Sequence, residues 1–281
     1  MAPTPLSIVD KRRAFRQLHV SGCFVLPNPW DAGSARYLQS LGFKALATTS
    51  SGLAWSKGRP DNGLPRERVL EHLHELVQAT ELPINADFEN GFAADAAAVG
   101  DSVRLAVETG VAGLSIEDST GRADAPLYDL DVAVARLRAA RRAIDAAGGD
   151  TLLVARSEGF IVGKPDLAET IARLRAYAQV GADCLYAPGL RTVEQIRAVV
   201  EAAKHLPVNV LKGSPSGPSL ATLAELGVRR VSVGGALARA AWGGFMRAAR
   251  ALAASGSFDE LESAPSHDDI DALMAPSGAA T

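Results

Sequence analysis

Eight short apolar segments recur along the chain, and a longer amphipathic segment follows each of them. They lie at Cys23–Asn28, Ala45–Ser50, Pro83–Phe88, Gly113–Asp118, Leu152–Glu158, Cys184–Gly189, Pro207–Gly213 and Arg230–Gly235. Their ends are roughly 20 to 40 residues apart, which is about the length of one strand–helix unit in a barrel. Alternation of this kind predicts parallel strands that are joined by helical crossovers.

A closed barrel and an open doubly wound sheet share this pattern. Eight units of similar length favour the barrel, and no Gly-x-Gly-x-x-Gly follows the first strand to suggest a dinucleotide fold. The length of 281 residues also suits one barrel. We therefore predict an α/β protein with a single (β/α)8 TIM-type barrel domain over residues 1–281, the barrel itself spanning about 20–255.

Helices are expected between the strands and at both ends of the chain. The clearest are Ala94–Thr109, Asp131–Ala147 and Asp166–Val180, each of which ends close to a glycine that stops the helix. An opening helix is predicted at Ile8–Leu18. A C-terminal extension of about 256–281 contains one short helix, Ser266–Met274, with a capping-box-like start.

Composition narrows the classes of function. The net charge of −3 argues against a nucleic-acid partner, and the basic residues of Lys11–Arg16 and Arg136–Arg142 are expected on solvated helix faces. The two cysteines, Cys23 and Cys184, are interpreted as buried free thiols in a reducing compartment. The sequence shows neither a signal-peptide pattern nor an apolar run of about 18 residues, so we expect a cytoplasmic protein without a membrane partner.

Acidic side chains follow two neighbouring predicted strands. Asp87 and Glu89 are two residues apart and would face the same side if the strand continues that far, and Glu117 ends the next strand. Because the active site of such barrels lies at the C-terminal ends of the strands, these carboxylates should converge there. Converging carboxylates repel one another unless a cation or protons intervene, and oxygen ligands suit Mg²⁺ or Mn²⁺. The alternative is that they are solvated or paired with Arg156.

Other polar groups at the strand ends are candidates for substrate binding. The planar guanidinium of Arg156 matches the two oxygens of a carboxylate, although a salt bridge to Glu158 or Glu117 is the alternative. Ser50, Ser51 and Gly52 offer hydroxyl and backbone N–H groups, unless they form only a tight turn. All five histidines fall outside the strand ends, so neither a zinc cluster nor a Ser-His-Asp triad is supported. Lys212 leaves a Schiff-base aldolase as a minor alternative.

Several segments together resemble the isocitrate lyase/phosphoenolpyruvate mutase superfamily, from about Leu26 to Ala241. They are Pro27–Arg36 (PNPWDAGSAR), Thr49–Leu53 (TSSGL), Gly58–Asp61 (GRPD), Asp87–Gly91 (DFENG), Ile116–Asp118 (IED) and Ala155–Glu158 (ARSE). Each is weak alone, but their order at successive strand ends is specific.

The resemblance implies a Mg²⁺-dependent enzyme that acts on an α-oxo acid through an enolate-like species. It implies that Asp87 is the chief metal ligand and that Glu89 and Glu117 complete the metal's shell, with Asp61 near the metal-bound waters. Ser51, Gly52 and Leu53 would hold the substrate carboxylate, with Trp30 also among the substrate-binding residues. Arg156, Asp61 and Glu117 would then carry catalytic roles, and a homo-oligomer is implied, a tetramer with exchanged C-terminal helices.

One segment departs from the family pattern. Lyases of the superfamily carry a Lys-Lys-Cys-Gly-His motif after the fourth strand, and its phosphonate-processing members carry a gating loop with a key Asn. Residues 118–126 read DSTGRADAP and hold neither motif. The histidine that the phosphonate-processing members use after the sixth strand is also missing, since residues 186–189 read YAPG. Glu89 replaces the commoner Asp. Cleavage of isocitrate or methylisocitrate is therefore not expected.

Two classes of function remain open on these grounds. The first is a metal-dependent carbon–carbon lyase or decarboxylase of a small α-oxo or 2-hydroxy acid, with a phosphonopyruvate-type C–P enzyme as its variant. The second is a barrel that binds an oxo acid without cleaving it. The Schiff-base alternative at Lys212 predicts borohydride trapping and no metal requirement.

Overall fold

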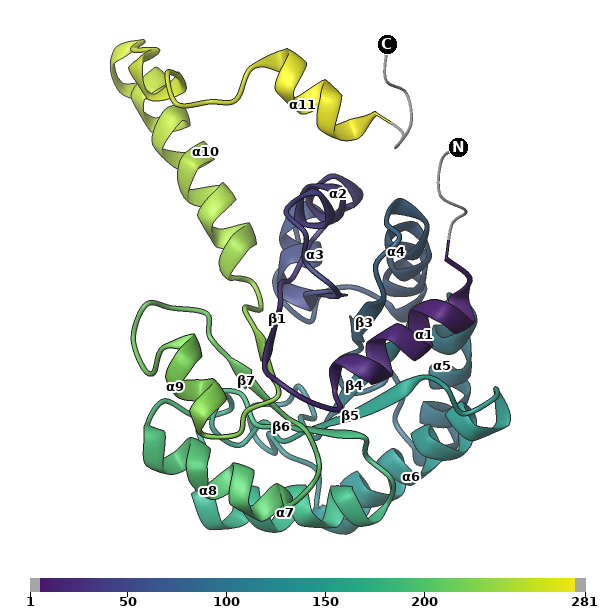
Figure 1. Cartoon of the computed structure of the whole chain (residues 1–281). Helices are drawn as coiled ribbons and strands as arrows, with labels where there is room; N and C mark the ends of the chain where they lie inside the picture. Colours follow the sequence, from purple (N-terminus) through teal and green to yellow (C-terminus); the bar gives the residue numbers. More distant parts are fainter. Residues whose placement is uncertain (1–5, 276–281) are drawn as a thin grey trace.

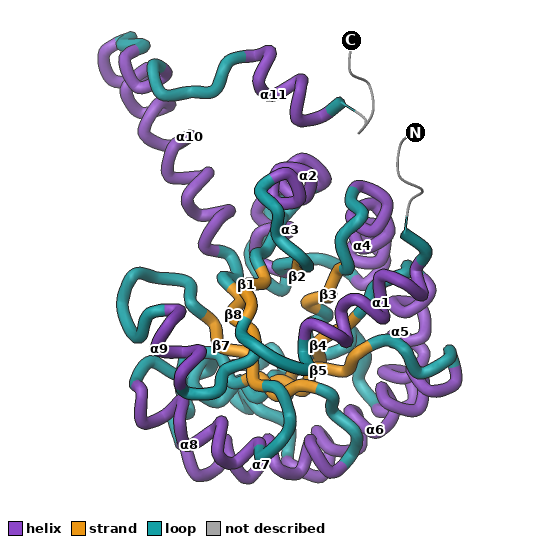
Figure 2. Tube along the Cα trace, in the orientation of Figure 1, coloured by secondary structure: helices purple, strands orange, loops and turns teal. Residues whose placement is uncertain are grey.

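The computed structural model describes residues 6–275 and places eight parallel strands around one axis (Figure 2). The strand order is β1-β8-β7-β6-β5-β4-β3-β2, so β1 pairs with β8 although the two lie at opposite ends of the barrel sequence. The strands are β1 (Phe24–Leu26), β2 (Leu46–Ala47), β3 (Ile84–Asp87), β4 (Gly113–Glu117), β5 (Leu152–Arg156), β6 (Cys184–Tyr186), β7 (Val208–Leu211) and β8 (Arg230–Ser232).

The barrel closes between β1 and β2 through two contacts beyond the strand ladders. The backbone N–H of Ala47 donates to the Pro27 carbonyl at 3.0 Å. The Asn28 side-chain amide donates to the Thr48 carbonyl at 2.8 Å. The (β/α)8 architecture predicted from the alternating segments is therefore confirmed, although most strands are shorter than their predicted ranges.

Most helices surround the strands in a ring, and the last two extend away from it (Figure 1). They are α1 (Ile8–Leu18), α2 (Ala32–Ser40), α3 (Ser50–Ser56), α4 (Arg66–Ala79), α5 (Ala96–Glu108), α6 (Leu130–Ala146), α7 (Leu167–Gln179), α8 (Val193–Ala203), α9 (Leu220–Glu225), α10 (Ala236–Ser255) and α11 (His267–Met274). The predicted bounds of α5 and α7 differ by one or two residues, because the capping residues Asp95 and Asp166 are themselves extended.

The main apolar core lies between the strands and the helix ring, where Phe88, Leu114 and Ile144 are buried. The barrel interior differs from the branched apolar layers usual for this fold. Asn85, Asn209 and Arg230 are buried there. A polar column thus runs down the inside of the barrel below the strand ends.

The prediction that the basic residues of Arg136–Arg142 and Lys11–Arg16 lie on solvated helix faces is partly wrong. Arg136 is only 1% exposed and donates hydrogen bonds to the carbonyls of Asn90, Ala93 and Ala94, while its guanidinium lies 4.1 Å from the Tyr128 ring centre. Long cationic side chains can satisfy several carbonyls at the end of a loop, which charge patterning alone does not reveal.

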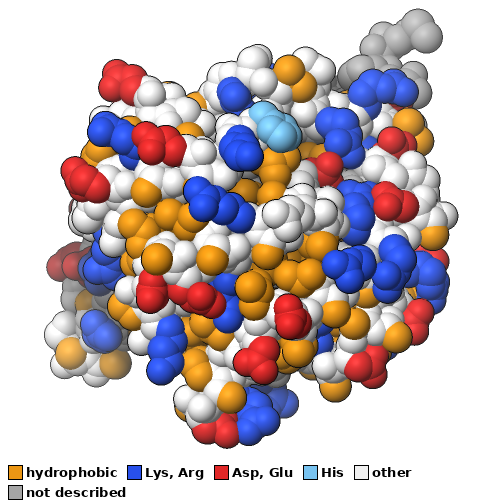
Figure 3. All heavy atoms as spheres, turned by 90° about the horizontal axis from the view of Figure 1, so that it is seen from below, with side chains coloured by type: hydrophobic (Ala, Val, Ile, Leu, Met, Phe, Trp, Pro, Cys, Tyr) orange, Lys and Arg blue, Asp and Glu red, His pale blue; other side chains and the backbone are white. Residues whose placement is uncertain are grey.

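The same correction applies to the first helix. Lys11 and Arg12 are buried and donate to carbonyls at the C-terminal ends of neighbouring helices, including Thr80 and Val107. Cys184 is buried as expected, whereas Cys23 is only half-buried. Elsewhere, Figure 3 shows Lys and Arg side chains interspersed with Asp and Glu side chains on one face.

The C-terminal segment forms an arm. Helix α10 projects from the barrel, and α11 turns back towards α2 (Figure 1), where Arg36 donates to the Met274 carbonyl at 2.6 Å. Within α10 only Ala238 is buried, and Trp242 and Phe245 are 40% and 61% exposed. In residues 6–275, no helix has the length and apolar character needed to cross a membrane.

Candidate active site at the mouth of the barrel

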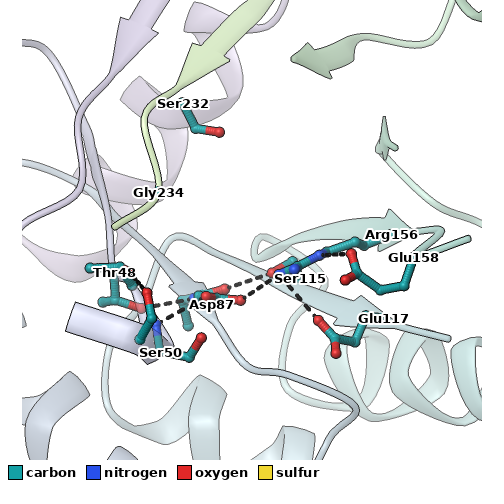
Figure 4. Close-up of polar contacts among 12 residues, drawn as sticks. Thr48, Ser50, Asp87, Ser115, Glu117, Arg156, Glu158, Ser232 and Gly234 are labelled. Atoms are coloured by element: carbon teal, nitrogen blue, oxygen red, sulfur yellow. Dashed lines mark hydrogen bonds and ion pairs between the residues drawn. The ribbon is translucent and has the colours of Figure 1, made fainter. Parts of the chain in front are cut away.

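Arg156, at the end of β5, lies among three carboxylates (Figure 4). Its Nη1 is 3.0 Å from Asp87 Oδ1 and 3.1 Å from Glu117 Oε2, and its Nε is 2.5 Å from Glu158 Oε1. Adjacent parallel strands place their ends side by side, and β4 pairs with β5 so that Glu117 lies opposite Arg156. The alternative in which Arg156 pairs with protein carboxylates is therefore the arrangement in this structure.

Asp87 is held in place by the second strand and the start of α3. Its backbone N–H donates to Thr48 Oγ1 at 2.8 Å. Its Oδ2 accepts a hydrogen bond from the Ser50 backbone N–H at 3.0 Å (Figure 4). These contacts and Arg156 orient both carboxylate oxygens.

Glu89 reaches the site by a different route from the one predicted. Strand β3 ends at Asp87, and Glu89 lies in the left-handed region with φ 46°, so it does not share a strand face with Asp87. Its carbonyl accepts the Glu117 N–H at 2.9 Å, which joins the two turns. Burial, followed by the charges of Asp87 and Asp61, raises the pKa of Glu89 to about 8.

The acidic side chains around Arg156 outnumber the cations that could balance their charge. Burial raises the pKa of Glu117 well above its ordinary value despite Arg156, and burial also raises that of Glu158. Asp61 lies at the cavity rim, where partial burial and the nearby Asp87 carboxylate raise its pKa. One guanidinium therefore faces five acidic side chains, which an additional cation would stabilise.

The donor set fits a divalent cation in ligand type and charge, because carboxylate oxygens predominate and their charge is incompletely balanced. As they stand, no three acidic, histidine or cysteine side chains within residues 6–275 are grouped to hold one ion. Arg156 accounts for this, since it lies between Asp87 and Glu117. The roles of Asp87, Glu89 and Glu117 as metal ligands stay a prediction.

A polar cavity of about 140 Å³ opens beside Arg156. Ser50, Ser51 and Asp61 line it, as do Asp87 and Arg156. The remaining lining residues come from the other strands and their loops: Asn28, Ala47, Thr48, Thr49, Asn85, Ser115, Tyr186, Asn209, Leu211, Arg230, Ser232, Gly234 and Gly235. Its size and polarity suit a small oxygen-rich acid.

Three predicted substrate-binding residues do not line this cavity. The N–H groups of Gly52 and Leu53 donate to Thr49 within the first turn of α3. Trp30 instead lines an apolar groove with Trp242 and Phe245. Their assignment to substrate binding stays a prediction, and it requires a conformation of this region different from the one described.

Lys212 and the histidines also lie apart from the cavity. Lys212 lines a separate pocket, and its Nζ donates to the Pro215 carbonyl at 3.2 Å and to the Ser216 carbonyl. His19 is buried at the base of the barrel, and His72 is buried in α4.

Sequence reasoning missed the cavity residues of the last three strands. Tyr186, Asn209, Arg230 and Ser232 all line the cavity. For Arg230 and Ser232 the signal was present as two polar side chains two residues apart inside an apolar segment, a spacing that keeps them on one strand face. Tyr186 and Asn209 gave no such signal. Asn28 was also missed. Its Oδ1 accepts the N–H groups of Val233 and Gly234 at 2.9 Å each.

The family model for phosphoenolpyruvate phosphomutase matches residues 15–253. The chain belongs to this family. The superfamily resemblance drawn from the strand-end motifs is thereby confirmed.

Individual family members show how close the relationship is. An oxaloacetate decarboxylase from Bradyrhizobium sp. (strain ORS 278) is 32% identical over 79% of this chain and 77% of the relative. A crystal structure of a lyase/mutase-type protein from Burkholderia cenocepacia J2315 is 50% identical, with a TM-score of 0.92 over 94% of this chain and 96% of that one. Phosphonopyruvate hydrolase in complex with oxalate and Mg²⁺ is 26% identical, with a TM-score of 0.84 over 94% of each chain.

Proposed function

We propose that this family member is a Mg²⁺-dependent lyase or decarboxylase of a small α-oxo or 2-hydroxy carboxylic acid, acting through an enolate-like species. The observation that carries the proposal is the group of buried carboxylates around Arg156, beside a polar cavity of about 140 Å³. The oxaloacetate decarboxylase relative and the phosphonopyruvate hydrolase with oxalate and Mg²⁺ support this class of substrate and metal.

Asp87, Glu89 and Glu117 would hold the metal ion, with Mn²⁺ as a substitute for Mg²⁺. The ion would polarise the oxo group of the substrate and stabilise the negative charge that develops when the neighbouring bond breaks. Arg156 would turn from its protein carboxylates to an anionic oxygen of the substrate. The hydroxyls of Ser50 and Ser51 would orient the substrate carboxylate, and Asp61 would lie at the rim over the bound acid.

Turnover of a substrate panel tests this proposal. Oxaloacetate, phosphonopyruvate, phosphoenolpyruvate and methylisocitrate are supplied with Mg²⁺, with and without EDTA. We expect turnover of an oxo acid that EDTA abolishes, and Asp87→Ala should lower it by about 10²-fold or more. Asp101→Ala, on the exposed face of α5, is the matched control. EDTA-resistant turnover, or unchanged Mg²⁺ affinity in Asp87→Ala, would contradict the proposal.

The panel also separates the alternatives. Preferential turnover of phosphonopyruvate would identify a C–P bond enzyme. This substrate is included because phosphonopyruvate hydrolase is 26% identical to the chain. Tight binding of oxalate with Mg²⁺ but no turnover of any acid would identify a non-catalytic oxo-acid-binding barrel. A cytoplasmic location stays part of the proposal.

We further propose that the chain assembles as a homo-oligomer, a tetramer by family resemblance. The exposed apolar side chains of α10 support this, because Trp242, Phe245 and Met246 lie on a helix with almost no intramolecular cover. Light scattering should give a multiple of 29.3 kDa for the parent chain and a smaller particle for Phe245→Asp, which places a charge on the exposed apolar face of α10.

A further inference from the structure

The loop after β4 supplies neither the cysteine nor the histidine that lyases of the superfamily carry there, yet an enolate must receive a proton to become a product. Residues 119–127 instead close on themselves, with an antiparallel bridge between Ser119 and Leu127. The proton donor must therefore come from another part of the cavity wall.

Tyr186 lies in that wall and carries an acidic proton on an uncharged side chain. It ends β6 opposite Arg156 on β5, is only 8% exposed, and lines the cavity with Asp87 and Arg156. The Arg156 guanidinium lies 5.3 Å from the centre of its ring. Burial raises the pKa of Tyr186 to about 12, although Arg156 opposes this shift, so the phenol carries its proton at neutral pH.

Beside Tyr186, a chain of hydrogen bonds leads from Ser232 down the barrel interior. The Ser232 hydroxyl lines the same cavity as the Tyr186 phenol and favours the ionised form of the phenol, which lowers its pKa. Ser232 Oγ in turn accepts from Asn209 Nδ2 at 3.0 Å. Asn209 Oδ1 accepts from Arg230 Nε at 2.9 Å. Figure 4 shows Ser232 apart from the group around Arg156, with which it shares the cavity.

Arg230 places a buried positive charge at one end of this chain of hydrogen bonds. It is 2% exposed and forms no ion pair with any carboxylate in residues 6–275; its other neighbours are Asn85 Oδ1 at 3.3 Å and His19 Nε2 at 3.5 Å. Burial lowers the pKa of His19 to about 3, so this imidazole is neutral. A buried cation at one end of a hydrogen-bonded chain favours negative charge near the other end, at Ser232, beside which Tyr186 would lose its proton.

We propose that Tyr186 is the proton donor to the enolate carbon, and that Ser232, Asn209 and Arg230 are positioning residues that orient its hydroxyl. This inference rests on the proposed lyase function. It assigns to β6, β7 and β8 the part of the chemistry that the loop after β4 does not supply.

In an α-oxo acid with a β-carboxylate, bond cleavage precedes the proton transfer. The bond between C3 and the β-carboxylate breaks, carbon dioxide leaves, and the electron pair forms the C2=C3 bond while C2–O becomes an enolate oxygen. The O–H proton of Tyr186 then moves to C3 as the C2=O bond re-forms. The phenolate takes a proton from a cavity water, which leaves as hydroxide and hydrates the carbon dioxide.

Hydrogen exchange at C3 of pyruvate isolates this proton transfer from bond cleavage. The full chain with Mg²⁺ and pyruvate in D₂O is followed by proton NMR. The parent should exchange the methyl hydrogens, and Tyr186→Phe should lose about 10²-fold or more of that rate. Oxalate affinity with Mg²⁺, measured by calorimetry, should change less than about threefold, because the phenol is not a primary anion ligand. Tyr37→Phe, on exposed α2, is the matched control and should behave as the parent.

Ser232 provides a second, independent variant. Ser232→Ala should lower exchange by about tenfold while oxalate binding and the thermal midpoint are retained, and Ser232→Thr should restore most of the rate. Exchange within threefold of the parent in Tyr186→Phe would overturn the inference while leaving the lyase proposal intact. A parent that turns over no acid and binds neither oxalate nor Mg²⁺ would overturn both.

Discussion

Glu117 and Asp118 are consecutive residues at the end of β4, yet they belong to different parts of the molecule. Glu117 faces the mouth of the barrel and shares Arg156 with Asp87 and Glu158. Asp118 faces the helix ring. Its Oδ1 accepts the Glu158 N–H at 2.7 Å, and its Oδ2 accepts the Tyr177 hydroxyl at 2.6 Å and Arg173 Nη1 at 3.3 Å.

The difference is one of charge balance. Asp118 has three donors of its own, one of which is a cation, so its burial is compensated within the protein. Glu117 has a share in one cation that three carboxylates use, and its pKa is raised well above the ordinary value, chiefly by burial. Alternation along a strand thus separates a structural carboxylate from one that is available to a ligand.

The largest expected effect is at Glu117. In Glu117→Gln we expect oxo-acid turnover to fall by about 10³-fold, because the amide removes an anionic oxygen from the proposed metal shell. The free energy of unfolding, measured by urea in EDTA at pH 8, should stay equal or increase, because one buried carboxyl in excess is removed. A large loss of stability in this variant would mean that Glu117 is structural and would erase the contrast with Asp118.

Asp118→Asn should show the opposite balance. The amide places N–H groups against the Tyr177 hydroxyl or the Glu158 N–H, and it leaves Arg173 without its carboxylate at that end. We expect the free energy of unfolding to fall by about 3 kcal/mol in urea titration. Oxalate affinity with Mg²⁺ should change much less than in Glu117→Gln. Equal losses of binding and stability in both variants would show that the two carboxylates act as one unit.

The smallest effect is in the outer helix layer, where His72 lacks the compensation that Asp118 has. Its Nε2 is buried without a hydrogen-bond partner among the described residues, and burial lowers its pKa to about 4. An unfolded chain protonates this histidine below about pH 6.5, whereas the folded chain does so only near pH 4. Its contribution to stability is therefore complete above pH 6.5 and is lost as the pH falls.

Removal of the imidazole should remove that slope. The difference in unfolding free energy between the parent and His72→Gln should shift by about 2 kcal/mol in favour of the variant between pH 7 and pH 4.5. His74→Gln, two residues along the same helix and exposed, is the matched control. His19 contributes in the same direction in all three proteins and cancels in the difference. Parallel pH profiles for parent and His72→Gln would contradict the expected protonation behaviour.

Much of this protein follows from local patterns. The eight apolar segments and the helix stops between them predict the barrel, because strand and helix periodicities are properties of short stretches of chain. The same rule brings Asp87, Glu117 and Arg156 together, since parallel strands of one barrel end at one face. Local periodicity also predicts the N-terminal helix, whose observed bounds Ile8–Leu18 agree with the prediction.

The tertiary structure decided the rest. The turn at Glu89, the bonded N–H groups of Gly52 and Leu53, and the choice of Arg156 between substrate and protein carboxylates depend on neighbours that lie far apart in the sequence. The chain from Arg230 through Asn209 to Ser232, and its place beside Tyr186, depend on the register of three strands and on which faces point inward. The excess of acidic groups at the mouth also depends on the fold, because only a folded chain takes those acids out of water and gathers them around one guanidinium.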